Sequence, residues 1–146
     1  MDKTLQQNIT KEFVERETSL YDTLYFYGER QKVHLLIDAI TKEYTQRYPS
    51  SKVLRTNADD FRKETIEQIV CEIHYYIPSC DLYIFENIDA VAGMEANEQR
   101  LYGVLDWLLK NKRQIIISGS VPTKRLWNLA PRICAQIAGG IALCVE

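Results

Sequence analysis

Short apolar segments alternate with longer amphipathic segments along nearly the whole chain. The apolar segments predict strands at residues 23–27, 53–54, 82–85, 115–117 and 141–145. The amphipathic segments predict helices at residues 4–17, 32–48, 61–76 and 95–111. Because right-handed crossovers place helices on the faces of a parallel sheet, this alternation predicts an α/β fold with five parallel strands.

Apolar residues that recur every three or four positions mark the helix faces expected to pack on the sheet. In residues 32–48 and 61–76 these are Val33, Leu36, Ile40 and Tyr44, followed by Ile66, Ile69, Val70 and Ile73. Pro78 is expected to end the second of these helices. Residues 115–117 are three consecutive isoleucines, which is typical of a buried central strand.

Length and composition favour one globular domain, residues 1–146, in which residues 1–22 form a helix and a connector. The chain has 146 residues, of which 46% are hydrophobic and 26% charged. Its longest apolar run is about half of the roughly 20 residues that a membrane span needs, so no span or signal peptide is expected. Four cysteines without metal-type spacing predict reduced, mostly buried thiols in a cytoplasmic protein, with neither zinc nor disulfides.

The net charge of −2 gives no general attraction to nucleic acid or acidic membranes, but the charges are unevenly distributed. Residues 107–145 contain six lysines and arginines and no acid, whereas residues 59–72 contain five acids and two basic residues. The basic region has two interpretations, a functional patch or ordinary solvated side chains. Both stay open at this point.

Polar residues follow several predicted strands. They are Gly28, Thr56–Asn57, Glu86–Asn87 and residues 118–120. Since ligands of open parallel sheets bind at the carboxyl ends of the strands, we expect any chemistry to be located here.

Seven short segments together suggest a family. In chain order they read LYFYG, KVHLL, YPSSKVL, ADDF, DLYIFENIDAVAGME, LLKNKRQIIISGSVP and LAPRI. Over residues 23–145 this order resembles the ATPase core of the bacterial replication initiator DnaA, within the AAA+ superfamily. The resemblance implies a P-loop NTPase-like αβα sandwich around a five-stranded parallel sheet, without the family's lid, amino-terminal domain or carboxyl-terminal reader of duplex DNA.

The expected phosphate-binding loop departs from the family pattern G-x-x-x-x-G-K-[ST]. In that pattern, backbone amides wrap the phosphates, lysine balances their charge and the hydroxyl holds Mg²⁺. Here the segment runs from Gly28 to Val33, which replaces the hydroxyl, and the second glycine is absent. Lys32 matches the family lysine, but Glu29 places a negative charge where an anion would bind.

The other nucleotide motifs are altered as well. Glu86 and Asn87 stand where the family has two aspartates; Glu86 could still face a metal, but Asn87 cannot accept a proton. Ser120 belongs to the polar segment where an aspartate is usual. Gly28, Lys32, Glu86, Asn87 and Ser120 are therefore the candidate residues of a degenerate nucleotide site.

The closing arginine-rich motif of the family is only partly present. Arg132 matches its first arginine, whereas Gln136 stands at the position of the intersubunit arginine finger. His34 matches a family histidine near the phosphate loop, and a packing or capping role is expected for it. The resemblance thus implies an assembly face without catalytic chemistry.

Together these losses favour a pseudo-ATPase that does not hydrolyse ATP and acts through protein contacts. The expected role is an accessory or regulator of bacterial chromosomal replication initiation, with the initiator DnaA or another replication protein as partner. Lys124, Arg125 and Arg132 are the candidate interface residues. No metal site and no ATP or Mg²⁺ cofactor are expected. Direct DNA binding is not expected either, because residues 94–96 lack the basic residue that the family uses on single strands.

Three alternatives stay open. The first is an ATP- or ADP-binding switch that uses Lys32 and Glu86. The second is a nucleic-acid-associated module that uses the basic residues of 107–145, whose binding would fall steeply with salt. The third is a remnant without present function.

Overall fold

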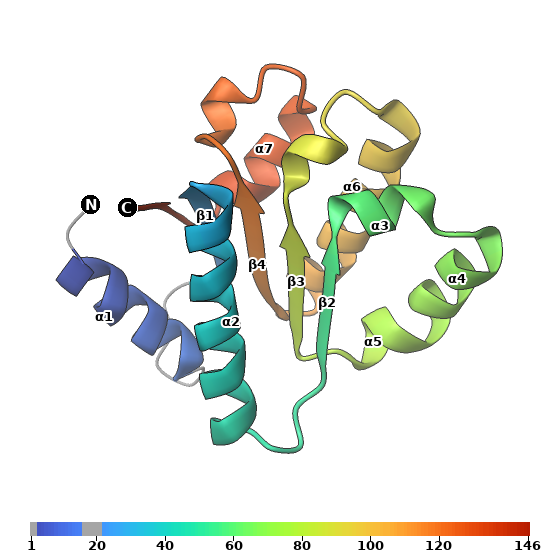
Figure 1. Cartoon of the computed structure of the whole chain (residues 1–146). Helices are drawn as coiled ribbons and strands as arrows, with labels where there is room; N and C mark the ends of the chain where they lie inside the picture. The colour runs from blue at the N-terminus through green and yellow to red at the C-terminus, as the bar shows by residue number, and fades with distance from the viewer. Residues whose placement is uncertain (1–2, 16–21) are drawn as a thin grey trace.

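The computed structural model describes residues 3–15 and 22–146, and its centre is a sheet of five parallel strands (Figure 1). The strands lie in the order β2-β3-β4-β1-β5, so β4 is central. Their bounds are β1 Thr23–Gly28, β2 Val53–Asn57, β3 Leu82–Glu86, β4 Gln114–Gly119 and β5 Ile141–Val145. The predicted five-stranded parallel α/β fold is confirmed.

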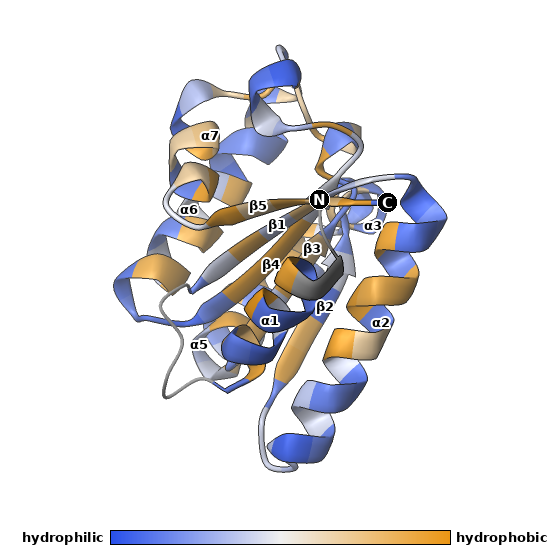
Figure 2. Cartoon of the chain, turned by 90° about the vertical axis from the view of Figure 1, so that its left-hand side faces the viewer, coloured by the Kyte–Doolittle hydropathy of each residue, from blue (hydrophilic) through white to orange (hydrophobic). Residues whose placement is uncertain are grey.

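Helices cover both faces of the sheet, which makes a three-layer αβα sandwich (Figures 1 and 2). One face is covered by α1 (Lys3–Val14) and α2 (Arg30–Arg47). The other is covered by α3 (Ala58–Lys63), α6 (Glu95–Lys110) and α7 (Pro131–Ala138). The shorter elements are α4 (Ile66–Cys71), the π-helix η2 (Glu72–Tyr76), α5 (Ile77–Ser79) and the 3-10 turns η3 (Ile88–Ala90) and η4 (Thr123–Arg125).

Side chains of the central strands alternate between the two faces, as the pleat requires. Ile116 points toward α1 and α2, whereas Ile115 and Ile117 point toward α6 and α7. All three are at most 1% exposed. The prediction that 115–117 is a buried central strand is therefore confirmed.

The predicted helix at 32–48 begins earlier and buries a slightly different face. Helix α2 starts at Arg30, and its buried residues include Ile37, while Leu36 is only half-buried. The buried positions Val33, Ile37, Ile40 and Tyr44 are spaced by four, three and four residues. That spacing averages close to the 3.6-residue helical period, which puts Leu36 at the edge of the face.

The prediction of one helix at 61–76 with Ile66, Ile69, Val70 and Ile73 facing inward is wrong. Helix α3 ends at Lys63, and a new helix begins after Thr65, whose side chain forms a capping box with Gln68. The π-helical turn of η2 then shifts the register again. The new helix that begins after Thr65 leaves Ile66 80% exposed and Val70 about half exposed, and Ile73, within η2, is also about half exposed. The element also extends to Ser79, past the expected stop at Pro78.

The amino-terminal helix predicted at 4–17 is confirmed to Val14, and residues 16–17 lie outside the described part of the chain. It is attached to the core by Phe13 and Val14, both 1% exposed. Within the described residues no helix is long and apolar enough to cross a bilayer. All four cysteines are free thiols, but only Cys80 is buried, so the expectation of mostly buried thiols is wrong.

Candidate functional site

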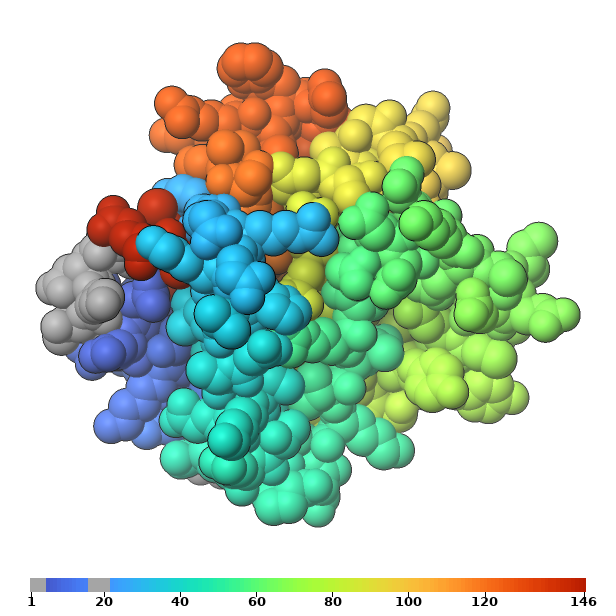
Figure 3. Space-filling view, viewed as in Figure 1, coloured from blue at the N-terminus to red at the C-terminus, as the bar shows by residue number. Residues whose placement is uncertain are grey.

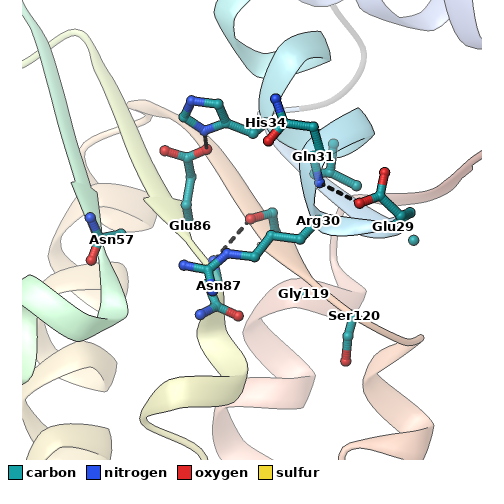
Figure 4. A pocket seen from close by; sticks show the side chains of 12 residues that line it. Glu29, Arg30, Gln31, His34, Asn57, Glu86, Asn87, Gly119 and Ser120 are labelled. Carbon is teal, nitrogen blue, oxygen red and sulfur yellow. Dashed lines mark hydrogen bonds and ion pairs between the residues drawn. The ribbon is translucent and has the colours of Figure 1, made fainter.

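A cleft of about 520 Å³ opens at the carboxyl ends of β1, β3 and β4, next to the first turn of α2 (Figure 4). It brings together four of the five candidate residues, Gly28, Glu86, Asn87 and Ser120. Lys32 is exposed and does not line the cleft. The other lining residues are Glu29, Arg30, Gln31, Val33, His34, Asn57, Ser118 and Gly119.

The amino terminus of α2 is capped by the side-chain carboxylate of Glu29. Glu29 is the N-cap residue, and its Oε1 and Oε2 accept hydrogen bonds from the backbone amides of Gln31 (3.0 Å) and Lys32 (3.1 Å). These bonds lower the pKa of Glu29 below its ordinary value. Amides at a helix amino terminus are the groups that bind a phosphate in such folds. In this chain they already hold an anion.

Gly28 is required by strand pairing, whether or not a phosphate binds. Its φ is +142°, a value that residues with a side chain rarely adopt. It pairs with Val145 of β5, and a Cβ at this position would lie 2.5 Å from the carbonyl oxygen of Val145. The close approach of β1 and β5 therefore explains this glycine by itself.

Glu86, at the position of a family aspartate, is bound by two side chains of the same chain. Arg55 on β2 donates from Nε to Oε2 (3.0 Å) and from Nη2 to Oε1 (3.2 Å), a bidentate arrangement. Nδ1 of His34 lies 2.9 Å from the same Oε1. Both carboxylate oxygens of Glu86 are therefore engaged, and its side chain is only 13% exposed.

Asp38 is the second carboxylate that accepts a hydrogen bond from Arg55. It accepts a 2.6 Å hydrogen bond from Nη1 of Arg55, and this bond lowers the pKa of Asp38. Nε2 of His34 lies 3.6 Å from its other oxygen. We call Asp38, His34, Arg55 and Glu86 the ion network. It joins α2, β2 and β3, and its members His34 and Glu86 line the cleft.

Arg55 and Asp38 were not predicted from the sequence. His34 was expected to have a packing or capping role, whereas the structure places it in the ion network. One available signal was a charged residue directly after the second predicted strand, residues 53–54. Another was the i,i+4 spacing of His34 and Asp38 on one helix face.

Asn87 and Ser120 contribute backbone geometry and hydroxyl contacts to the cleft wall. Asn87 has a left-handed backbone (φ 60°, ψ 56°), and its amide donates to Oγ of Ser118 at 2.9 Å. Ser120 donates from its amide to Oδ1 of Asp89 at 3.0 Å and from its hydroxyl to the other oxygen of Asp89. Asp89 is thus bound to the cleft wall on β4's side.

The groups that would bind the phosphates and the metal of a nucleotide are engaged by side chains of this chain. Glu29 holds the helix amides that would bind phosphate, and Arg55 and His34 hold the carboxylate that would face the metal. Within the described ranges, no group of three or more His, Cys, Asp or Glu side chains is arranged to hold a metal ion. The arrangement instead links three elements through charge pairs.

The candidate interface residues are only partly brought together. Lys124 and Arg125 are exposed neighbours on η4. Arg132 lies at the start of α7, where its guanidinium is 5.0 Å from the ring centroid of Tyr102 on α6. Gln136, at the arginine-finger position, turns inward and donates to the carbonyl of Tyr102 at 3.1 Å.

Replacing Arg55 with methionine is expected to lower the free energy of unfolding by about 1–3 kcal/mol, because Glu86 then keeps a poorly solvated charge without its main partner. Urea denaturation measures this loss. Arg30→Met is the matched control: Arg30 is 73% exposed and makes only a 3.8 Å contact with Asp59, so less than about 0.5 kcal/mol should be lost. An Arg55→Met protein as stable as the control would show that the ion network contributes nothing to stability.

Comparison with known proteins identifies the family. The model of the bacterial DnaA ATPase domain matches residues 2–144. The chain belongs to this family. The DnaA of Aquifex aeolicus is 25% identical over 148 residues, and that of Lachnoclostridium phytofermentans is 26% identical over 140 residues. These alignments cover 97% and 90% of this chain but only 36% and 31% of those proteins, so the chain spans about a third of their length.

Solved structures agree with this assignment. The replication initiator DnaA bound to AMPPCP and single-stranded DNA superposes with a TM-score of 0.83 at 26% identity, covering 97% of this chain and 46% of that one. DnaI superposes with a TM-score of 0.73 at 14% identity, and the match covers 98% of this chain and 81% of the DnaI chain. This similarity shows a shared fold. The chain is thus a DnaA-like AAA+ domain.

Proposed function

We propose that this DnaA-family chain is a non-hydrolysing AAA+ core that acts through protein contacts as an accessory or regulator of bacterial replication initiation. One observation carries the proposal: the carboxylate of Glu29 binds the amides of Gln31 and Lys32 at the amino terminus of α2. A phosphate group would have to displace this carboxylate and overcome its negative charge.

The ion network supports the same proposal. To coordinate Mg²⁺, Glu86 would have to share its carboxylate oxygens with the guanidinium of Arg55, whose positive charge opposes a cation at the same site. Asn87 has an amide side chain, which has no basic oxygen to accept a proton from an attacking water. Each such loss at a phosphoryl-transfer site removes a group that normally positions charge or water.

A role in protein contact is supported by the part of the family architecture that is kept. The chain retains the complete five-stranded sheet with helices on both faces, while the residues that would serve nucleotide chemistry are engaged elsewhere. A fold that is retained without its chemistry can still dock on a true initiator and limit its assembly. The proposed partner is the initiator DnaA or another replication protein.

We expect no appreciable binding of Mg-ATP, with a dissociation constant weaker than about 1 mM, because the phosphate-binding amides and the metal-binding carboxylate are both engaged. Isothermal titration calorimetry tests this expectation, with Lys32→Ala as the matched variant. A micromolar constant that disappears in Lys32→Ala would overturn the proposal in favour of the nucleotide-binding switch.

A further inference from the structure

Trp127 is the most exposed large apolar side chain among the described residues, with 89% of its surface accessible. It lies in the loop between η4 and α7. The segment that contains this loop is coloured orange in Figure 3 and projects at the top of the view. Trp127 is the only aromatic residue in the sequence from 108 to 146. Tryptophan is enriched among the few interface residues that contribute most of the binding energy in protein complexes.

The loop holds Trp127 in a defined position. The amide of Leu126 donates to the carbonyl of Thr123 at 3.0 Å, and the amide of Leu129 donates to the carbonyl of Leu126 at 2.9 Å. Leu129 is 4% exposed and belongs to the core. Two anchored leucines thus flank the tryptophan, so a partner that binds it would order little additional backbone.

The loop that carries Trp127 also contacts the loop that contains Gly93. Asn128 packs against Gly93, where a Cβ built on the glycine would lie 3.3 Å from the Cβ of Asn128. Met94, the next residue, is 38% exposed. The loop that carries Trp127 therefore rests on a second loop that adds apolar surface.

The surroundings of Trp127 in the chain are positively charged. Lys124 and Arg125 precede it by three and two residues, so their Cα atoms lie within about 11 Å of its own. Residues 107–145 contain no acid, and in the described part of the chain no ion pair joins Lys124 or Arg125 to a carboxylate. Both cations remain available to a partner.

We propose that Trp127, Lys124 and Arg125 form a docking surface for an acidic segment of a protein partner, with the indole as the buried anchor. The inference rests on the proposed function, since it names the partner chemistry of a chain that acts through protein contacts. A protein segment fits better than single-stranded nucleic acid, because base-stacking surfaces place several aromatic side chains along a basic groove. Here Trp127 is the only aromatic residue of the sequence from 108 to 146.

The first experiment places a photo-crosslinking amino acid at position 127 in the full chain, in the bacterium from which it comes. Mass spectrometry then identifies the crosslinked peptide, with the same crosslinker at Leu35 of α2, 55% exposed, as control. We expect a protein crosslink specific to position 127 that maps to an acidic segment. Absence of a specific crosslink, a crosslink to nucleic acid or a crosslink to a basic segment would overturn the inference.

The second experiment measures affinity for the identified acidic segment as a synthetic peptide. Trp127→Ala should weaken binding by about 30-fold or more, as expected of a buried aromatic anchor, while Lys124→Gln with Arg125→Gln should slow association and abolish most of its salt dependence. Arg132→Gln should change the affinity for the peptide only slightly, because the Arg132 guanidinium lies against the ring of Tyr102. Unchanged affinity in Trp127→Ala would contradict the inference.

These outcomes separate the inference from the proposed function. Unfolding of Trp127→Ala should match the parent, because its side chain is almost fully exposed. Mg-ATP calorimetry on the same proteins tests the non-hydrolysing core independently. If the chain binds nucleotide tightly and Trp127 still contacts the acidic segment, the proposal of a non-hydrolysing core fails and the proposed docking surface stands.

Discussion

Replacing Ile116 with alanine is expected to lower the free energy of unfolding by roughly 2–5 kcal/mol. Ile116 is completely buried on the central strand β4, between Ile84 of β3 and Leu24 of β1. Its side chain packs in the core that α1 and α2 cover, so truncation removes apolar contacts and leaves a cavity. Since a domain of this size is stable by about 5–15 kcal/mol, the loss is severe.

Urea denaturation of Ile116→Ala measures the effect, and Ile66→Ala provides a control with the same chemical change. Ile66 is 80% exposed at the start of α4, so its truncation should cost less than about 0.5 kcal/mol. Equal stability of the two variants would contradict the central placement of β4. The comparison also tests the exposed position of Ile66 at the start of α4.

The strands were predictable from sequence because a parallel strand buried on both faces must be apolar at every position, as residues 115–117 are. The helix at 61–76 was not, because periodicity assumes an unbroken helix of constant pitch. A cap at Thr65 and a π-helical turn from Glu72 each change the register. Ile66 and Ile73 are therefore exposed although their spacing is that of an inward face.

The site was predictable where it depends on one local segment. Glu29 follows a strand and precedes a helix, so its charge at the anion position could be inferred, and the structure adds its bonds to the amides of Gln31 and Lys32. The ion network could not be inferred in the same way. Arg55 and Glu86 are 31 residues apart and meet only because β2 and β3 are neighbours in the sheet. Strand order is not encoded in local periodicity.

A second charged group, away from the cleft, holds the π-helical segment to α6. Arg100 donates from Nη2 to Oε2 of Glu64 (3.0 Å) and Oε2 of Glu72 (2.6 Å), and from Nη1 to the carbonyl of Phe61 (2.9 Å). Its guanidinium lies 3.7 Å from the ring centroid of Phe61. The three charged side chains are only 11–14% exposed. One cation therefore compensates two poorly solvated carboxylates.

Replacing Arg100 with methionine is expected to lower the free energy of unfolding by about 3–5 kcal/mol at pH 8, because Glu64 and Glu72 then face each other without a cation. Methionine keeps much of the side-chain volume, so loss of packing contributes little. Thermal and urea unfolding measure the change. Arg132→Met is the matched control, since its guanidinium also lies on an aromatic ring but is exposed, and it should lose less than about 1 kcal/mol.

The dependence on pH identifies the cause. Burial, and then the neighbouring Glu64, raise the pKa of Glu72 from 4.5 to about 7 in the folded protein. The folded state therefore binds a proton more tightly than the unfolded chain, so the stability from this proton is complete below pH 4.5 and is lost as pH rises through 7. Without Arg100 the carboxylates depend even more on protonation, so Arg100→Met should lose less stability at pH 5 than at pH 8. Glu72→Gln should be at least as stable as the parent at pH 8. Equal losses for Arg100→Met at both pH values would assign its effect to packing and contradict the charge argument.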